Sequence, residues 1–312
     1  MITLKQYDPS MKPLWDRLVA DAKNATFIHR RDYMDYHRQR FADCSLVAYR
    51  DNAPVAVLPA NRVDDTLYSH QGLTYGGWLT RAAHFDVAVM LQIFDAMSTY
   101  LPTQGINRLI YKPAPHIYHA YPAEEDLYAI FRYGGRIVGS NVSATVPVNE
   151  ALRFNENARR GLRQAIASGA VVAETDDLAP YWAILTDLLR QRYGVAPVHT
   201  LQEMQMLRDA FPANIRLFTA TIEERTVAGV LIYDTGRVAH AQYIAASEEG
   251  KQKKVLPLIF DYLINKVYAA TPYFDFGTSN EDGGRYLNEG LSRQKTGMGG
   301  RAIVYNTYEI NF

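Results

Sequence analysis

Apolar residues follow two different periods along the chain. Phe85, Val89 and Ile93 recur on one helical face, which predicts a helix over residues 85–101. Short apolar runs bounded by turn residues, such as Ile215–Thr221, predict strands. The same criteria predict further helices at residues 14–19, 32–40, 178–193, 201–211 and 253–269. They predict further strands at residues 45–49, 54–59, 67–70, 109–111, 142–148, 227–233, 238–245, 273–276 and 301–308.

The predicted elements occur twice in the same order. Leu46 corresponds to Leu217 and Leu109 to Phe274, at offsets of 171 and 165 residues. A recurring offset predicts a duplicated domain, although so common an element order could also recur by chance. We expect an α/β (α+β) fold with two domains, residues 1–150 and 151–312, each a mixed twisted sheet flanked by helices. A basic helix over residues 152–168, ended by Gly169, opens the second domain.

The amino-acid composition argues against several classes of protein. Lys plus Arg and Asp plus Glu each total 33, so the net charge is zero, which argues against DNA or another polyanion as the main partner. The one cysteine, Cys44, excludes a disulfide framework and fits a reducing compartment. No signal peptide and no apolar run of about 18 residues is present, so we expect a cytoplasmic protein without a membrane span. We expect a monomer or homodimer, and no metal.

The C-terminal segment carries the most specific motif. It reads Phe274-Asp275-Phe276-Gly277, then Gly290-Leu291, Lys295 and Gly297-Met298-Gly299. This resembles tandem-GNAT proteins related to the FemABX peptidyltransferases and BioF2-like acyltransferases, in which an Asp-Phe-Gly strand precedes Gly-Leu-x-x-Phe-Lys-x-x-Phe-Gly. Gln294 and Met298 stand where those proteins have aromatic residues.

The resemblance implies an N-acyltransferase with two tandem GNAT domains. Such an enzyme would transfer an acyl or aminoacyl group from acyl-CoA or aminoacyl-tRNA to an amine. The family suggests an amino sugar or a cell-envelope precursor as the acceptor. The alternative is a non-catalytic protein on the same scaffold that binds a glycan, a peptide or a nucleotide.

The donor turn departs from the pattern of GNAT enzymes that use acyl-CoA. Those enzymes have Gln/Arg-x-x-Gly-x-Gly/Ala after the third strand, whereas Gly250 is the only glycine here. Lys251, Lys253 and Lys254 could bind phosphates instead, or could form a solvated helix start. The sequence is therefore compatible with either acyl-CoA or aminoacyl-tRNA as the donor. The resemblance also implies that an unpaired backbone N–H, supplied by Tyr243-Ile244-Ala245, faces the donor carbonyl.

Four side chains are catalytic candidates. The resemblance implies that Lys295 stabilises an oxyanion or a phosphate, and that Tyr286 protonates the leaving group. Asp275 alternates with Phe274 and Phe276, so it points to the opposite face and could act as a base or orient one. His240 could be a general base at neutral pH. Each also has a structural reading: a surface lysine, a packed tyrosine, or a hydrogen-bonded Asp or His.

Further polar residues are candidates for substrate binding. Arg159 and Arg163 share a helical face, where they could hold a phosphate or carboxylate or simply be solvated. Asn280 lies on the loop after the predicted strand at 273–276. An acceptor pocket is predicted from a polar and aromatic cluster in the first half: Arg30, Arg31, Tyr33, His37, Tyr75 and Trp78.

Overall fold

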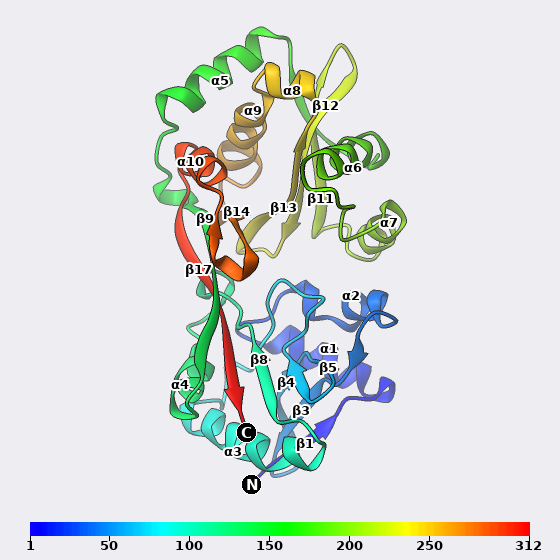
Figure 1. Cartoon of the computed structure of the whole chain (residues 1–312), viewed down its shortest axis with the longest axis vertical. Coiled ribbons are helices and arrows are strands. Elements are labelled where there is room, and N and C mark those ends of the chain that lie inside the picture. Colours follow the sequence, from blue (N-terminus) through cyan, green and yellow to red (C-terminus); the bar gives the residue numbers. More distant parts are fainter. The chain divides into compact units, whose positions relative to one another are not determined.

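The computed structural model describes residues 1–312, apart from the side chain of residue 193. The chain forms two compact units (Figure 1). Unit 1 comprises Met1–Asn141, Asp282–Arg285 and Val304–Phe312, and unit 2 comprises Val142–Glu281 and Tyr286–Ile303. Strands β9 (Arg136–Pro147) and β17 (Arg301–Asn311) each begin in one unit and end in the other.

Unit 1 packs helices against two groups of strands. One sheet has the order β1-β3-β4-β7, and a second set pairs β2 with β5, β5 with β6, and β6 with β8 in parallel. The strands are β1 (Ile2–Gln6), β2 (Ala42–Asp43), β3 (Leu46–Arg50), β4 (Ala53–Leu58), β5 (Asn61–Val63), β6 (Thr66–Tyr68), β7 (Leu79–Thr80) and β8 (Arg108–Tyr111). The helices are α1 (Lys12–Asp21), α2 (Arg31–Met34), α3 (Val87–Thr103) and α4 (Glu125–Arg132). Helix α3 buries Ile93, Phe94 and Met97 completely, so it forms the centre of this core.

Unit 2 is built on a mixed sheet with the order β10-β11-β12-β13-β14-β9. Its strands are β10 (Val171–Thr175), β11 (Ile215–Ile222), β12 (Arg225–Asp234), β13 (Val238–Ala246), β14 (Tyr273–Thr278) and the end of β9. Its helices are α5 (Glu156–Ala167), α6 (Ala179–Tyr193), α7 (Leu201–Ala210), α8 (Glu248–Gln252), α9 (Val255–Tyr262) and α10 (Glu289–Gly297). Helices α6 and α7 lie on one face of the sheet, and α9 packs against α5 on the other (Figure 1). A small hairpin, β15 (Asn280–Glu281) with β16 (Tyr286–Leu287), follows β14.

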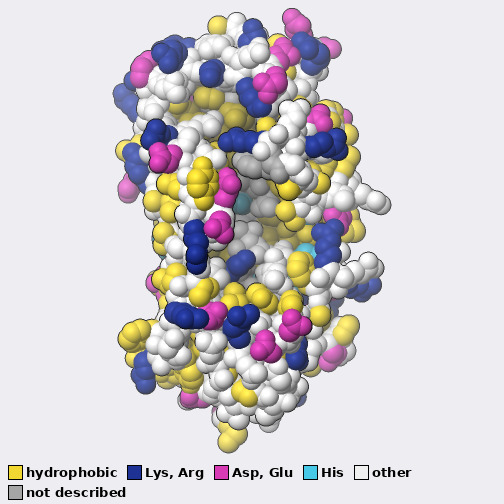
Figure 2. All heavy atoms as spheres, viewed as in Figure 1, with side chains coloured by type: hydrophobic (Ala, Val, Ile, Leu, Met, Phe, Trp, Pro, Cys, Tyr) yellow, Lys and Arg dark blue, Asp and Glu magenta, His cyan; other side chains and the backbone are white. Residues whose placement is uncertain are grey.

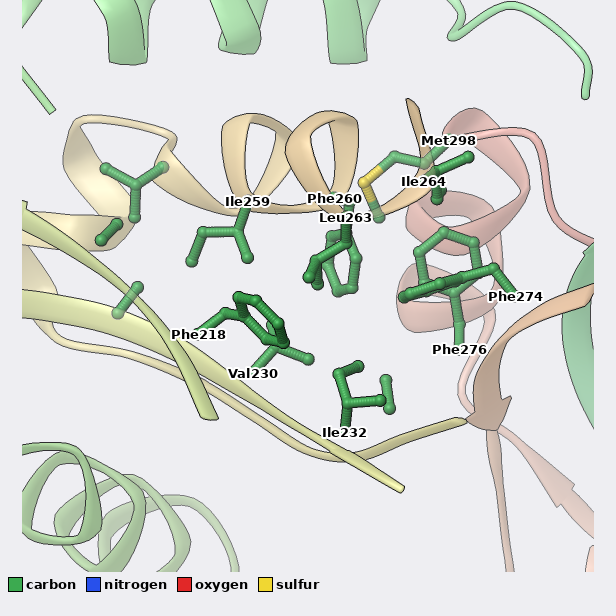
Figure 3. Close-up of a cluster of buried hydrophobic side chains, with 14 of the residues drawn as sticks. Phe218, Val230, Ile232, Ile259, Phe260, Leu263, Ile264, Phe274, Phe276 and Met298 are labelled. Carbon is green, nitrogen blue, oxygen red and sulfur yellow. The ribbon is translucent and has the colours of Figure 1, made fainter. Parts of the chain in front are cut away.

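Aromatic side chains of β14 anchor the core of unit 2. Phe260 of α9 packs edge-on against Phe274 and Phe276, with ring centroids 5.9 and 4.8 Å apart (Figure 3). All three are fully buried, as is Phe218 on β11. Because alternate strand residues point to opposite faces, this packing directs Asp275 away from the aromatic core.

The mixed α/β fold predicted from the sequence is confirmed, and the differences have local causes. Helix α5 begins at Glu156 because the Asn155 side chain accepts a hydrogen bond from the Ala158 amide and caps the first turn. The helix predicted over residues 253–269 begins at Val255, because Lys254 before it adopts a left-handed φ of 58°, and its last turns, Leu263–Val267, are π-helical. The helix predicted over residues 32–40 is only α2 followed by a 3-10 turn.

A buried carboxyl group joins two elements of unit 1. Asp126 of α4 accepts a hydrogen bond from the Tyr111 hydroxyl at 2.7 Å, and that hydroxyl accepts one from the Trp78 amide at 2.6 Å. Burial raises the pKa of Asp126 to about 7. The folded protein therefore favours the neutral acid at pH values where the unfolded chain carries a carboxylate.

This burial predicts a pH-dependent stability. As pH rises from about 4 to about 7, the unfolded chain gives up the Asp126 proton while the folded protein keeps it, so the free energy of unfolding falls. The slope approaches about 1.4 kcal/mol per pH unit. Asp126→Asn does not titrate, so its stability relative to the wild type should increase steadily over this range. Urea unfolding at pH 5, 6 and 7 measures the difference, with the exposed Asp64→Asn as the matched control. A difference that stays constant with pH would contradict the buried acid.

Candidate functional site

Strands β13 and β14 share only a short ladder. They pair in parallel from Val238 with Tyr273 to His240 with Asp275, three residue pairs in all. A register shift against β12 then leaves Gln242 as an extra residue in β13. Another shift, against β9, follows Asp275, where Gly277 takes a left-handed φ of 77°. Bulges redirect side chains and end pairing, so the site develops around the end of this ladder.

Asp275 is a fully buried carboxylate with a complete set of donors. Its Oδ1 accepts from Ser143 Oγ at 2.5 Å, Thr145 Oγ1 at 3.0 Å and the Gly277 amide at 3.2 Å. Its Oδ2 lies 2.9 Å from Nδ1 of His240. Ser143 and Thr145 come from β9, which pairs with β14 at this point. Because all these partners can donate, the group acts as an acceptor, as an ionised carboxylate does.

Asp275 sets the orientation of the His240 ring. A carboxylate opposite Nδ1 requires that this nitrogen carries the hydrogen, which leaves the lone pair of neutral histidine on Nε2. The His240 side chain is 12% exposed, so it is close to the surface of the site. The pair is thus arranged to accept a proton at Nε2.

Lys295 of α10 reaches the same point from the other side of Gly277. Its Nζ donates to the carbonyl of Gly277 at 2.9 Å and to that of Thr278 at 2.7 Å. The side chain is 4% exposed, and burial lowers its pKa to about 8, an effect that the Asp275 carboxylate opposes. A Cβ at position 277 would lie 3.4 Å from Cε1 of His240, so Gly277 adjoins the histidine and accepts from the lysine.

Tyr243, on β13 beyond the ladder, contributes a buried phenol. Its hydroxyl lies 2.7 Å from Nδ1 of His199, which precedes α7, and the Trp182 ring meets it edge-on at 5.6 Å. Burial raises the pKa of Tyr243 to about 12, so the phenol is neutral at physiological pH. The sequence predicted a role only for the backbone of this residue.

A basic cavity of about 590 Å³ opens where α5, α8, α10 and the start of α9 meet. Four cationic residues line it, and no Asp or Glu is among its described lining residues: Arg160, Lys251, Lys254 and Arg293. Gly161 permits the close approach of α5, because a Cβ there would lie 3.3 Å from the Pro257 ring. The cavity can therefore accept an anionic group of substantial size.

Gly250 serves packing at this cavity. A Cβ at this position would lie 2.3 Å from the Val227 carbonyl oxygen, so only glycine fits against β12. Its amide already donates to the Ser247 hydroxyl at 3.1 Å. Lys251 and Lys254 line the cavity, whereas Lys253, the third predicted lysine, is exposed outside its lining.

The structure brings together three of the four catalytic candidates. Lys295, Asp275 and His240 surround Gly277, although they are far apart in the sequence. Tyr286 lies on hairpin strand β16 and is 58% exposed. Within the described part of the chain, no hydrogen bond joins it to the other three.

The predicted arginine pair and Asn280 have partners within unit 2. Arg159 and Arg163 both pair with Glu156 at 2.8 Å, whereas Arg160, on the adjacent face, lines the basic cavity. The Asn280 side chain accepts from the Val142 amide at 2.6 Å.

The predicted acceptor cluster lies in unit 1 and is largely buried there. Arg31 forms ion pairs with Asp35 and Asp43. Of the remaining members, only Arg30 is exposed. Three of the others pack against neighbouring rings: Tyr33 against Phe27, His37 against His70, and Tyr75 against Tyr118. The Trp78 Nε1 donates to the Met97 sulfur.

Several residues of the site were not predicted from the sequence. Ser143 and Thr145 alternate with apolar residues in the predicted strand at 142–148, a pattern typical of polar groups on one strand face. Arg160 and Arg293 gave no signal beyond their charge. His199 directly precedes the Thr200–Glu203 capping box of α7, which marks a helix start rather than a site.

Two negative findings apply to the described residues. No group of three or more His, Cys, Asp or Glu side chains among them is placed to hold a metal ion. None of the described helices is long and apolar enough to cross a membrane. On the face drawn in Figure 2, basic and acidic side chains are interspersed, as the zero net charge suggests.

Comparison with known proteins supports the fold. Residues 153–286 match the model of the acetyltransferase (GNAT) domain. No curated protein matches the sequence. Among solved structures, FemX is similar over 99% of this chain and 97% of its own, with a TM-score of 0.66 and 12% identity.

Two further structures are similar over nearly the whole chain. L-PGS from Bacillus licheniformis gives a TM-score of 0.57 at 12% identity, covering 98% of this chain and 92% of its own. A tandem GNAT protein from the clavulanic acid biosynthesis pathway gives 0.52 at 9% identity, covering 100% and 98%. The chain thus has a tandem-GNAT fold like that of FemX, with a GNAT acetyltransferase domain in its second half.

The environment of Lys295 predicts an unusual titration. Because burial opposes the charged form and lowers the pKa of Lys295, its ammonium group should titrate near pH 8, well below a typical surface lysine. NMR of protein labelled at lysine Cε would show one resonance with this midpoint, and Lys295→Met would remove it. A midpoint near 10 for the resonance lost in Lys295→Met would contradict the buried position.

Proposed function

We propose that this tandem-GNAT protein is an N-acyltransferase that moves an acyl or aminoacyl group from an activated donor directly to an amine. The observation that carries the proposal is the arrangement of His240, Asp275 and Lys295 around Gly277, at the end of the β13–β14 ladder. The group combines a proton acceptor, a buried carboxylate that orients it, and a cation. These are the components that acyl transfer to an amine requires.

The reaction would proceed in one transfer. The amine, once neutral, attacks the donor carbonyl carbon, forming a C–N bond. His240 Nε2 takes the proton that the nitrogen loses, and Asp275 stabilises the resulting imidazolium. The C–S bond of a thioester, or the C–O bond of an aminoacyl ester, then breaks, and the leaving group receives a proton from the His240 imidazolium, which becomes neutral again. No covalent enzyme intermediate is needed.

Lys295 would stabilise the charge that develops on the carbonyl oxygen. Two of its three N–H bonds are used on the Gly277 and Thr278 carbonyls, and the third makes no hydrogen bond among the described residues. Backbone N–H groups of Tyr243, Ile244 and Ala245, beyond the ladder with β14, are the proposed second source of donors.

The basic cavity would hold the phosphates of the donor. Acyl-CoA and aminoacyl-tRNA both carry phosphates, and Arg160 and Lys254 offer side-chain cations where the usual glycine turn is reduced. Lys254 makes no ion pair with the described residues, so its charge is available. We propose acyl-CoA as the first donor to test and aminoacyl-tRNA as the second. The acceptor would be an amine, with amino sugars and cell-envelope precursors as the first candidates.

A non-catalytic binding protein is the second candidate. The observation that favours it is the Gly250 amide, which is occupied by Ser247 and so is not offered to a ligand. A protein of this kind would bind a glycan, peptide or nucleotide without turnover. Incubation with panels of acyl-CoA thioesters, charged tRNA and amines decides between the two, because only the enzyme forms an amide product.

Substitution of Lys295 should reduce turnover. Lys295→Ala is expected to lower kcat at least about tenfold, because the carbonyl oxygen loses a stabilising charge. Wild-type activity should also fall as pH rises through about 8, where Lys295 loses its proton. Lys295→Arg stays protonated, so any activity that it retains should lack this alkaline decrease. Equal rates for wild type and Lys295→Ala would show that the lysine does not contribute to turnover.

Charge reversal in the basic cavity should weaken donor binding. Arg160→Glu and Lys254→Glu are each expected to raise the Kd for CoA about tenfold or more, because a phosphate would then face a carboxylate. Calorimetric titration with CoA measures this. Arg163→Glu, on the same helix but paired with Glu156 outside the cavity, is the matched control. If Arg163→Glu weakens binding as much as Arg160→Glu, the cavity is not the donor site.

A further inference from the structure

A second hollow, of about 390 Å³, lies directly after β14. Its walls come from the end of β14, strand β15, the first turn of α10 and the link between α6 and α7. Its lining includes Val195, Thr278, Ser279, Glu281 and Leu291. The Thr278 carbonyl also accepts a hydrogen bond from Lys295 at 2.7 Å. The hollow therefore begins beside the proposed reacting group.

Ser279 lines this hollow and carries a buried, unused hydroxyl. Its backbone is fixed on both sides, because its amide donates to the Val142 carbonyl at 3.0 Å and its carbonyl accepts from the Asn288 amide at 2.9 Å. The residue is 4% exposed, yet its Oγ has no hydrogen-bond partner among the described residues. A buried polar group without a partner is costly, so a ligand that supplies one gains binding energy.

Glu281 and Tyr286 combine a carboxylate with an aromatic ring. They are direct partners in the β15–β16 hairpin, so their side chains leave the same face. Glu281 is exposed and makes no ion pair with the described part of the chain, and the Tyr286 ring is 58% exposed. A carboxylate next to an open aromatic face is suited to an ammonium ion, by charge and by cation–π attraction.

The other walls distinguish this hollow from the basic cavity. Val195 and Leu291 add apolar surface, and the described lining includes no Lys or Arg side chain. An anionic ligand would meet only Glu281 as a formal charge, which would repel it. The chemistry therefore favours a cation with a small carbon skeleton.

We propose that this hollow receives the reacting amine of the acceptor in its ammonium form, an inference that rests on the proposed N-acyl transfer. Glu281 and Tyr286 attract the charge at the mouth, Ser279 hydrogen-bonds a polar group of the acceptor, and Val195 with Leu291 contact its carbon skeleton. The ammonium gives a proton to solvent water at the mouth, and the neutral amine then moves past Thr278 toward Gly277, beside His240 and Lys295. Glu281 is thus a specificity-determining residue, and not a catalytic one.

The test measures binding of defined amines without any donor. Glucosamine and n-butylamine are the probes, and glucose and n-butanol are their neutral counterparts. Ligand-observed NMR titrations at pH 7 should show binding of both amines and at least about tenfold weaker binding of the neutral compounds. Glu281→Gln should weaken amine binding about fivefold, as expected for a partly exposed charge, and Glu281→Lys should weaken it more.

Matched variants separate the hollow from general charge effects. Glu224→Lys makes the same charge change in the exposed turn between β11 and β12, and should bind the amines as the wild type does. Ser279→Ala should weaken glucosamine more than n-butylamine, because only the sugar offers hydroxyl groups. Equal binding of amines and neutral counterparts, or amine binding that is unchanged in Glu281→Lys, would overturn the proposal, as would the absence of amine binding to the wild type.

Failure of this inference is distinguishable from failure of the proposed function. If the protein acylates an amine, Glu281→Lys should raise KM for that amine and leave the Kd for CoA unchanged. An unchanged KM in Glu281→Lys would refute the acceptor site while leaving the transferase intact. Absence of any amide product with acyl-CoA thioesters and with charged tRNA, together with intact amine binding to the wild type, would instead refute the transferase.

Discussion

The buried carboxylate of Asp275 is the constraint on which the rest of the site depends. A charge without solvent in unit 2 is tolerated only because Ser143, Thr145 and the Gly277 amide donate to one oxygen and His240 faces the other. Those donors come from β9, β13 and β14. Satisfying one carboxylate therefore fixes the alignment of three strands and the tautomer of the histidine together.

The same constraint explains the bulge in β14. For its amide to reach Asp275 Oδ1, Gly277 takes a left-handed φ of 77°, a conformation that costs glycine little. The bulge also presents the Gly277 and Thr278 carbonyls to Lys295, which would otherwise be a buried cation without partners. The lowered pKa of Lys295 follows from this burial, so the acidic group, the basic group and the bulge form one electrostatic unit.

The sequence was sufficient to predict the fold class, and it named three residues that the structure places together, His240, Asp275 and Lys295. The two hydrophobic periods predicted the main helices and strands, and the Asp-Phe-Gly strand predicted that Asp275 points away from the aromatic core. Lys295 came from resemblance alone, because nothing in its local sequence distinguishes a buried lysine from a surface lysine. For Arg31 the local sequence suggested a binding role, because it is a basic residue in a polar cluster. In the structure its charge is neutralised by ion pairs with Asp35 and Asp43 inside unit 1.

What the sequence could not predict depends on contacts between distant segments. Ser143 and His240 are joined only through Asp275, and Arg160 faces the same cavity as Arg293 only because α5 packs on α9. The spacing of residues along a short stretch of sequence carries no information about contacts between distant segments. The left-handed turn at Lys254, just before α9, was also missed, because a lysine gives no local signal for a positive φ.

Helix α10 connects the two proposed binding regions with the reacting centre. Gly290, Arg293, Gln294 and Gly297 line the basic cavity, whereas Leu291 lines the hollow after β14. Leu291 and Lys295 are four residues apart and so lie on one face of the helix, which adjoins the face toward the cavity. A donor held by its phosphates on one side and an amine held on the other would approach each other at Lys295. If the proposed function holds, this short helix would set the distance between a phosphate-bearing donor and a cationic acceptor. Its N-cap residue Asn288 also donates its backbone amide to the Ser279 carbonyl.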